Sequence, residues 1–374
     1  MKYSKFEKLG ISTSLLGFGC MRFPQTPDGK IDEVEAEKML DTAIQAGVTY
    51  IDTAYPYHNG DSEPFVGRVL KKYDRDSFYL ATKLPIWELK KKEDVKRIFD
   101  DQLERLGVDH VDFYLLHSLD KERWQTVKDL DILPFVEAMR EEGKIRYIGF
   151  SFHDDYDAFA YILNDYDWDM CQLQFNYMDV NNQAGLKGVR LAGSKGIPVV
   201  VMEGLLGGRL ANAPDNVQAL YDAFPTKRSP VEWAFRWLCN QPEVATVLSG
   251  VTTVEQTRDN LRIFDTVEPG CMDADELALI DRVRDAYNSR IKVGCTGCAY
   301  CMPCPQGVDI PGSFSAWNNA SLYGGLGKGN KDYQRLCSEG KAPTQCVECG
   351  ACMAVCPQHI DIIDMLKNVT ADLA

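Results

Sequence analysis

Residues 33–57, EVEAEKMLDTAIQAGVTYIDTAYPY, contain the unit from which the fold can be predicted. Apolar residues recur at intervals of three and four over residues 33–46, which is the period of an amphipathic helix. Gly47 follows, and glycine is typical just beyond a helix because it adopts a left-handed backbone without a side-chain clash. The apolar run 48–52 has the length of a buried strand. The stretch therefore predicts a helix, a tight turn and a buried strand whose end carries polar residues.

The same alternation of helix and strand continues through most of the chain. Further helices are predicted at residues 94–106, 131–142, 231–239, 254–264 and 273–288. Apolar runs predict eight strands, at residues 15–19, 48–52, 78–83, 111–117, 145–151, 170–175, 198–202 and 244–248. Eight alternations over about 250 residues are typical of an α/β fold of the (β/α)8 TIM-barrel type. A doubly wound open sheet is the alternative, but the turn after the first strand lacks the third glycine of a G-x-G-x-x-G motif.

Eight of the 13 cysteines form two closely spaced runs near the C-terminus. The first run is Cys295-x2-Cys298-x2-Cys301-x2-Cys304-Pro, and the second is Cys346-x2-Cys349-x2-Cys352-x3-Cys356-Pro. The second run has the ligand spacing of bacterial ferredoxins. A zinc site would instead use two pairs of cysteines separated by a longer stretch, and a disulfide scaffold is typical of small secreted domains. The pattern predicts a small ferredoxin-like iron–sulfur domain at residues 291–374, after a barrel at residues 1–290.

The number of clusters depends on how the two runs share their ligands. In two-cluster ferredoxins the fourth cysteine of each run binds the other cluster. That pattern gives one [4Fe-4S] cluster to Cys295, Cys298, Cys301 and Cys356, and the other to Cys346, Cys349, Cys352 and Cys304. The first run departs from the pattern, because two residues rather than three precede its fourth cysteine. The sequence thus predicts two clusters and leaves a single cluster as the alternative.

The overall charge excludes several classes of partner. The formal net charge is −14, whereas nucleic acids and anionic membrane surfaces are bound through an excess of Lys and Arg. No apolar stretch has the length of a transmembrane helix, and residues 1–7 lead into no apolar segment of a signal peptide. Iron–sulfur clusters also require a reducing environment. We therefore expect a cytoplasmic protein that binds neither nucleic acid nor membrane.

Polar side chains follow three successive predicted strands. Asp52 ends the second strand and Tyr57 lies shortly after it, Lys83 ends the third, and His117 ends the fourth. Catalytic residues of such barrels lie at the C-terminal ends of the strands. A buried lysine beside a carboxylate and a tyrosine can depress the pKa of the phenol for acid catalysis. Each residue alone could be structural, but the three strand ends together predict an active site.

These segments resemble those of a known enzyme superfamily. Gly47-Val48-Thr49-Tyr50-Ile51-Asp52-Thr53-Ala54-x2-Tyr57, Ala81-Thr82-Lys83 and Asp112-Phe113-Tyr114-Leu115-Leu116-His117 resemble the tetrad segments of the aldo-keto reductases. The resemblance covers roughly residues 5–265, and with the cysteine runs the chain resembles the branch that carries a C-terminal ferredoxin-like domain. It implies that Tyr57 donates a proton to the substrate oxygen, that Lys83 and Asp52 tune Tyr57, and that His117 orients the carbonyl.

The resemblance also implies a nicotinamide cofactor, NADP or NAD, bound at the mouth of the barrel. The residues that it assigns to this cofactor are Gly19, Cys20, Met21, Ser151, Gln172, Met202, Glu203, Leu205, Gly207, Gly250, Thr252, Gln256 and Asn260. Phe152 replaces an asparagine of many members, and Met202 replaces a tyrosine that stacks on the nicotinamide. Gly250 and Gln256 stand where NADP-preferring members often have Lys and Arg, and Arg258 is the nearby cation. The choice between NADP and NAD therefore stays open.

The expected function is that of an NAD(P)-dependent oxidoreductase that interconverts a small-molecule carbonyl and an alcohol. Nicotinamide exchanges two electrons as a hydride, whereas a cubane cluster passes one electron at a time, so coupling the two requires an intermediary such as a flavin. Three hypotheses follow from this mismatch. The clusters exchange electrons with a redox partner protein, the cluster domain is a structural lid, or the protein is a nicotinamide-binding redox sensor.

Overall fold

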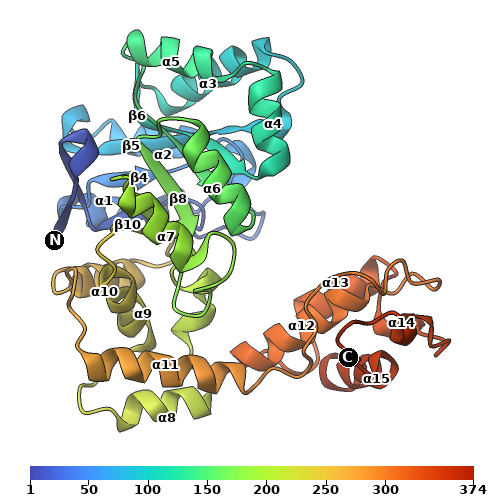
Figure 1. Ribbon diagram of the computed structural model, residues 1–374. Coiled ribbons are helices and arrows are strands. Elements are labelled where there is room, and N and C mark those ends of the chain that lie inside the picture. Colours follow the sequence, from blue (N-terminus) through green and yellow to red (C-terminus); the bar gives the residue numbers. More distant parts are fainter. The chain divides into compact units, whose positions relative to one another are not determined.

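The computed structural model describes residues 1–374, and the chain divides into two compact units. The first unit comprises Met1–Gly207 and Val231–Asp273, and the second comprises Gly208–Pro230 and Ala274–Ala374. Figure 1 shows the course of the chain through both units. The barrel strands all belong to the first unit, and the two cysteine runs belong to the second.

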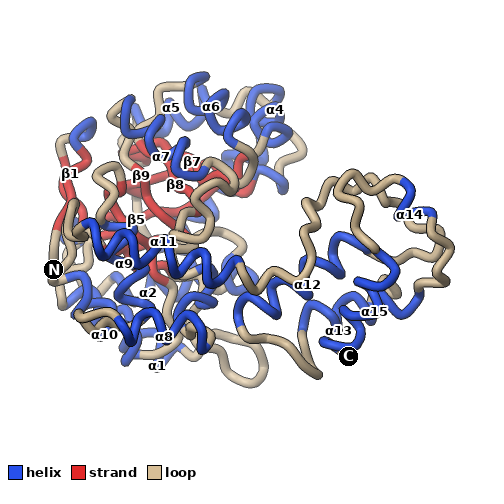
Figure 2. The backbone as a smooth tube through the Cα atoms, turned by 60° about the horizontal axis from the view of Figure 1, so that its bottom comes forward, coloured by secondary structure: helices blue, strands red, loops and turns tan.

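Eight parallel strands form a closed barrel in the order β10-β3-β4-β5-β6-β7-β8-β9. The strands are β3 (Leu16–Gly19), β4 (Tyr50–Asp52), β5 (Tyr79–Pro85), β6 (Val111–Leu119), β7 (Ile145–Phe152), β8 (Met170–Gln174), β9 (Val199–Met202) and β10 (Val244–Ser249). In Figure 2 the strands gather in the middle of the unit, with helices around them. The predicted (β/α)8 barrel is confirmed, and each of the eight predicted strands overlaps an observed one.

The helices of the first unit alternate with the barrel strands. They are α1 (Glu33–Gln45), α2 (Ser62–Leu70), α3 (Glu93–Leu106), α4 (Lys121–Asp129), α5 (Leu133–Glu141), α6 (Tyr156–Asp165), α7 (Gly185–Ser194), α9 (Pro230–Cys239) and α10 (Val254–Phe264). Asp32 begins α1 by accepting a hydrogen bond from the Glu35 N–H. Gly107 ends α3 at φ 63°, a left-handed conformation that favours glycine. Local capping thus fixes the start of α1 and the end of α3.

An N-terminal hairpin precedes the barrel and was not predicted from the sequence. Its strands, β1 (Tyr3–Phe6) and β2 (Ile11–Ser14), pair antiparallel. Phe6 is fully buried and belongs to the same apolar cluster as Tyr50 and Phe113. Its ring centroid lies 5.9 Å from that of Phe113. Each strand has four residues and is partly exposed, so its apolar pattern is too short to stand out, although Phe6 adds to the barrel core.

The second unit is helical, and Ala274–Ala374 contains no strand. Its helices are α8 (Asp215–Ala223), α11 (Ala274–Asn288), α12 (Ile310–Tyr323), α13 (Lys331–Ser338), α14 (Ala351–Ala354) and α15 (Ile362–Leu373). Phe314, Trp317, Leu336 and Leu366 are buried in one core, against which most of the run cysteines pack. The Trp317 Nε1–H donates to Asp372 Oδ2 at 2.8 Å and so joins α12 to α15. None of the helices in the chain combines the length and apolar character that crossing a bilayer requires.

Candidate active site and cluster site

Lys83 lies at the centre of a buried polar group at the C-terminal end of the barrel. Its Nζ donates hydrogen bonds to Asp52 Oδ1 at 2.7 Å and to the Thr53 carbonyl oxygen at 2.8 Å. The third contact is to the Tyr57 hydroxyl, at 3.3 Å. An ammonium group has three donors, so these contacts satisfy Lys83 completely although its side chain is 0% exposed. The pairing explains how a charged amine is tolerated inside the barrel.

The pKa values of these groups follow from burial and from their mutual charges. Burial raises the pKa of Asp52, and the Lys83 ammonium only partly opposes this. Burial works to lower the pKa of Lys83, but Asp52 and then Tyr57 together hold it above its usual value. Burial also raises the pKa of the Tyr57 phenol, while Lys83 acts to lower it. At neutral pH Lys83 is therefore charged and Tyr57 carries its proton.

His117, in β6, faces Tyr57 across the site. The two ring centroids are 6.1 Å apart, with the rings nearly perpendicular, and the Trp87 indole lies 4.9 Å from the imidazole on another side. Burial lowers the pKa of His117 well below its usual range, and the nearby Lys83 lowers it further. The imidazole is therefore neutral at physiological pH, so one ring nitrogen donates and the other accepts. Nδ1 has no hydrogen-bond partner.

A cavity of about 310 Å³ opens beside this group. Its walls include 10 of the predicted site residues, namely Gly19, Met21, Asp52, Tyr57, His117, Ser151, Gln172, Met202, Glu203 and Gly250. The Gln172 Nε2 lies 3.5 Å from the Met202 sulfur, and its Oε1 is buried without a hydrogen-bond partner. A buried acceptor of this kind is costly unless something donates to it. The carboxamide of a nicotinamide has such a donor, so the lining fits that group.

Six predicted cofactor residues lie outside the cavity wall: Cys20, Leu205, Gly207, Thr252, Gln256 and Asn260. Cys20 is fully buried, and its carbonyl accepts a hydrogen bond from Ser62 Oγ at 3.3 Å. Asn260 Nδ2 donates to Ser249 Oγ at 2.8 Å, and the Thr252 N–H donates to Gln256 Oε1 at 2.8 Å. The last two contacts order the chain between β10 and α10, outside the cavity wall.

Four residues that the sequence did not single out also line the cavity: Arg22, His153, Gln174 and Leu248. The Arg22 Nη2 lies 3.5 Å from Glu203 Oε1. Arg22 also lies over Gly250, where a β-carbon would meet its aliphatic atoms at 3.3 Å. Gln174 ends β8 and His153 directly follows β7. Their place at strand ends is the signal that could have found them, since that is where barrel sites form.

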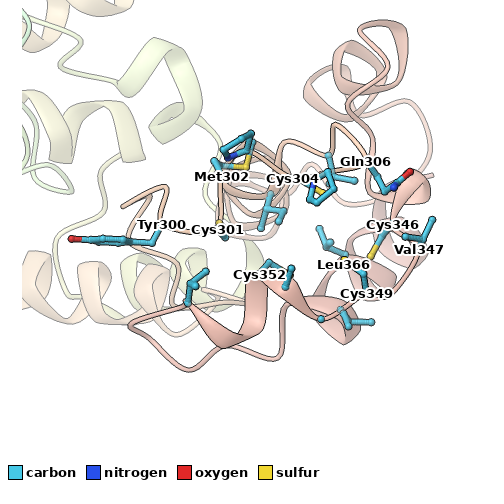
Figure 3. A pocket seen from close by; sticks show the side chains of 18 residues that line it. Tyr300, Cys301, Met302, Cys304, Gln306, Cys346, Val347, Cys349, Cys352 and Leu366 are labelled. Carbon is cyan, nitrogen blue, oxygen red and sulfur yellow. The ribbon is translucent and has the colours of Figure 1, made fainter.

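The second unit contains a smaller cavity of about 150 Å³ between the two cysteine runs (Figure 3). Its lining includes Cys301, Cys304, Cys346, Cys349 and Cys352. The pKa of the Cys352 thiol is raised by burial and then by the neighbouring Cys346, Cys304 and Cys349. Cys304, from the first run, thus lies with three thiols of the second run. This is the arrangement that a shared ligand set needs.

Cys301 lies near two other cysteines of the first run and one of the second. Burial raises the pKa of its thiol, and the neighbouring Cys295, Cys352 and Cys298 add to the effect. Cys356 packs against the helical core and does not line the cavity. No three His, Cys, Asp or Glu side chains converge as the ligands of a single metal ion do. Thiols of both runs line one shared cavity.

Comparison with known proteins identifies the families to which the two parts of the chain are similar. A model of the "Aldo/keto reductase family" matches residues 15–285, which is most of the chain. The chain belongs to the aldo/keto reductase family. A model of the "4Fe-4S dicluster domain" matches residues 294–360, so the predicted combination of reductase barrel and iron–sulfur domain is confirmed.

Named relatives align with about three quarters of the chain. An NADH-specific methylglyoxal reductase of Escherichia coli K12 is 26% identical over 312 residues, covering 70% of this chain and 93% of the relative. The L-galactose dehydrogenase of Arabidopsis thaliana is 25% identical over 295 residues, covering 73% and 91%. The holo form of an aldo-keto reductase from Bacillus halodurans superposes with a TM-score of 0.64 at 27% identity, covering 76% and 96%. The protein is thus an oxidoreductase by family.

Proposed function

We propose that this aldo/keto reductase uses NADH or NADPH to interconvert a small carbonyl compound and its alcohol, and that its clusters exchange electrons with a partner protein. The observation that carries the enzymatic part is the contact of a buried, charged Lys83 with the hydroxyl of Tyr57 at 3.3 Å. The hydroxyl belongs to a residue that lines the cavity. A proton donor beside a cation that stabilises its conjugate base is therefore available to a bound substrate.

In the direction of reduction, a bound nicotinamide cofactor would supply the hydride that the carbonyl carbon accepts. Tyr57 donates its phenolic proton to the carbonyl oxygen, which becomes the alcohol oxygen. The negative charge left on the phenol is stabilised by the Lys83 ammonium, which Asp52 and the Thr53 carbonyl hold in place. His117 is neutral, so its ring N–H orients the carbonyl oxygen by a hydrogen bond without itself supplying a full charge.

Ser151, Gln172 and Met202 are proposed to hold the nicotinamide end of the cofactor. The unpaired Gln172 Oε1 accepts from the carboxamide, and Met202 provides a polarisable surface for the ring. The residues outside the cavity, Cys20, Leu205, Gly207, Thr252, Gln256 and Asn260, are proposed to support the remainder of the dinucleotide. The name of the Escherichia coli relative favours NADH. A comparison of Kd values tests this: comparable affinities or tighter NADH are expected, and a hundredfold preference for NADPH would contradict it.

For the second unit we propose two [4Fe-4S] clusters. We also propose that the reductase domain comprises residues 1–290 and the cluster-binding domain residues 291–374. One cluster is held by Cys346, Cys349, Cys352 and Cys304, which line one cavity. The other is held by Cys295, Cys298 and Cys301 with Cys356. Two complete ligand sets exceed what a structural staple requires, which favours electron transfer over a lid. The two-electron hydride still has to be divided into single electrons, by a flavin or by the substrate.

An anaerobic assay of NADH or NADPH oxidation with methylglyoxal and other small carbonyl compounds tests the enzymatic part. Tyr57→Phe is expected to keep cofactor binding and to lose turnover. The sensor hypothesis predicts that cellular function survives this substitution. Electron paramagnetic resonance after anaerobic mixing with NADH or NADPH tests the electron-transfer part. A signal from reduced clusters supports it, whereas no signal in protein whose clusters dithionite reduces favours the structural lid.

A further inference from the structure

Glu63 is a fully buried carboxyl group that the proposed chemistry does not use. It lies in the first turn of α2, and its side chain is 0% exposed. Glutamate is almost never fully buried unless it is paired, because removing its charge from water is costly. The N-terminal end of a helix stabilises a negative charge and offsets part of that cost. Its position in the protein therefore calls for a specific set of partners.

One side of the Glu63 carboxyl is bonded to the strand that carries Lys83. Glu63 Oε1 accepts hydrogen bonds from Thr82 Oγ1 at 2.6 Å and from Gln102 Nε2 at 2.8 Å. The same Gln102 nitrogen lies 3.0 Å from the Lys83 carbonyl oxygen. The Tyr114 hydroxyl donates to Gln102 Oε1 at 2.8 Å, which sets the orientation of the amide. Glu63 is thus connected to the peptide of Lys83 through Gln102.

The other side of the carboxyl faces Arg105 of α3. Glu63 Oε2 has no hydrogen-bond partner and lies 3.8 Å from Arg105 Nη1. The Arg105 guanidinium lies 4.1 Å from the centre of the Tyr55 ring and pairs with Asp101 at 2.8 Å. The Tyr55 hydroxyl donates to Asp101 Oδ2 at 2.9 Å. Because Tyr55 is two residues from Tyr57, this contact chain restrains the segment after β4.

A neighbouring hydroxyl pair adds a third connection. Ser62, next to Glu63, has its Oγ 2.9 Å from the Thr53 Oγ1, and the Thr53 carbonyl accepts from Lys83. We propose that Glu63 is a positioning residue that sets the spacing of Lys83 and Tyr57, holding β5 through Thr82 and Gln102 and the Tyr57 segment through Arg105. Only its kinetic consequence rests on the proposed reaction.

The ionisation of Glu63 makes this positioning dependent on pH. Burial raises the pKa of Glu63 to about 7, against the opposing effect of Thr82, Gln102 and Arg105. The charged or titratable groups around it are Arg105 and Asp101 on α3, Tyr114 on β6 and Tyr55 after β4. Protonation at the free Oε2 leaves both hydrogen bonds to Oε1 but removes the attraction to Arg105. The Tyr57 segment is therefore held more tightly above about pH 7 than below it.

The test compares Glu63→Gln with the wild-type full chain carrying its clusters. Glutamine keeps the shape and an acceptor oxygen but cannot ionise. With methylglyoxal as the carbonyl, kcat is expected to fall roughly 10- to 100-fold, the usual effect of a small misplacement. The wild-type decrease of kcat below about pH 7 should disappear in the variant. A variant with wild-type kcat, or one that keeps this limb of the pH profile, would overturn the proposal.

Two further variants separate positioning from general stability. Asp112→Asn alters another fully buried carboxylate, which pairs with Arg75 at 2.7 Å and lies outside the cavity. It should keep the pH limb even where it lowers the melting temperature. Thr82→Val removes one hydrogen bond to Glu63, and is expected to lower kcat while retaining the limb. An unchanged kcat in Thr82→Val would also contradict the proposal.

Hydrogen exchange tests the same idea without turnover. After correction for the intrinsic pH effect, peptides covering residues 53–57 should exchange faster in wild type at about pH 6 than at about pH 8, on either side of the Glu63 pKa. In Glu63→Gln the two rates should agree. Equal rates in wild type would refute the positioning role. If no carbonyl compound is reduced by the wild type, the proposed function fails, whereas this exchange experiment still decides the role of Glu63.

Discussion

Replacing Lys83 with methionine should disable proton donation while leaving the cofactor cavity intact. Lys83 Nζ lies 3.3 Å from the Tyr57 hydroxyl. A unit charge at that separation stabilises a phenolate by about 5 kcal/mol at an effective dielectric constant of about 20. The negative charge of Asp52, hydrogen-bonded to the same ammonium, cancels part of this. If about half remains, the loss of about 2.5 kcal/mol corresponds to a decrease in kcat of roughly 70-fold.

The substitution also leaves the buried Asp52 without its partner. Burial raises the pKa of Asp52, so without the lysine this carboxyl takes up a proton, and the penalty for an unpaired charge is avoided. We therefore expect a folded Lys83→Met protein whose affinity for NADH, measured by fluorescence titration, stays within about threefold of wild type because Lys83 does not line the cavity. Asp52→Asn combined with Lys83→Met should resemble the single variant. A kcat within about threefold of wild type would refute the proposed role of the ammonium.

Three other experiments test the roles proposed for Gln172, Cys304 and Tyr57. Gln172→Leu removes the buried acceptor in the cavity wall. It should weaken NADH binding by about tenfold, roughly the value of one hydrogen bond, with a smaller effect on kcat. An unchanged affinity in a titration would contradict the proposal that Gln172 binds the nicotinamide carboxamide. Cys304→Ser removes one thiol from the cavity between the two cysteine runs, and should lower the iron content of anaerobically purified protein and the corresponding electron paramagnetic resonance signal. Cys337→Ser changes an exposed cysteine outside both runs, and as the control it should leave both unchanged. The pKa of Tyr57 lies above its usual value of 10.0, and the phenol can donate its proton only below that pKa. The rate of carbonyl reduction should therefore not fall until the pH rises into that strongly alkaline range. A loss of rate between pH 8 and pH 9 would contradict this.

The sequence was sufficient to predict the barrel because its strands are buried on both faces and read as continuous apolar runs. The ends of those runs also indicated Asp52, Tyr57, Lys83 and His117, and the structure brings these four side chains together. Strand ends in a parallel barrel meet at one edge, so their proximity follows from topology alone. The cysteine runs could likewise be predicted from the sequence, because the spacing of their ligands is local.

The parts that the sequence did not predict depend on contacts between elements. Glu63 and Gln102 lie 39 residues apart and are joined by one hydrogen bond. On a sequence each is simply a polar residue of an amphipathic helix. In the sequence Arg22 is only a charged residue of a loop, and its position over Gly250 becomes visible only in the folded structure. The β1–β2 hairpin was missed because its strands are short and partly exposed, and its contribution depends on where Phe6 packs. Such features require the distance between side chains, which no local pattern contains.

Anaerobic turnover with NADH or NADPH and a panel of small carbonyl compounds, measured for wild type and for Tyr57→Phe, tests whether Tyr57 is the proton donor in carbonyl reduction. Wild type is expected to oxidise the reduced cofactor with formation of the alcohol. Tyr57→Phe should bind the cofactor equally well but reduce the carbonyl at least roughly 100-fold more slowly, as expected when a general acid is lost. Equal rates in the two proteins would contradict the assignment of Tyr57 as the proton donor, and with it the proposed chemistry of the site.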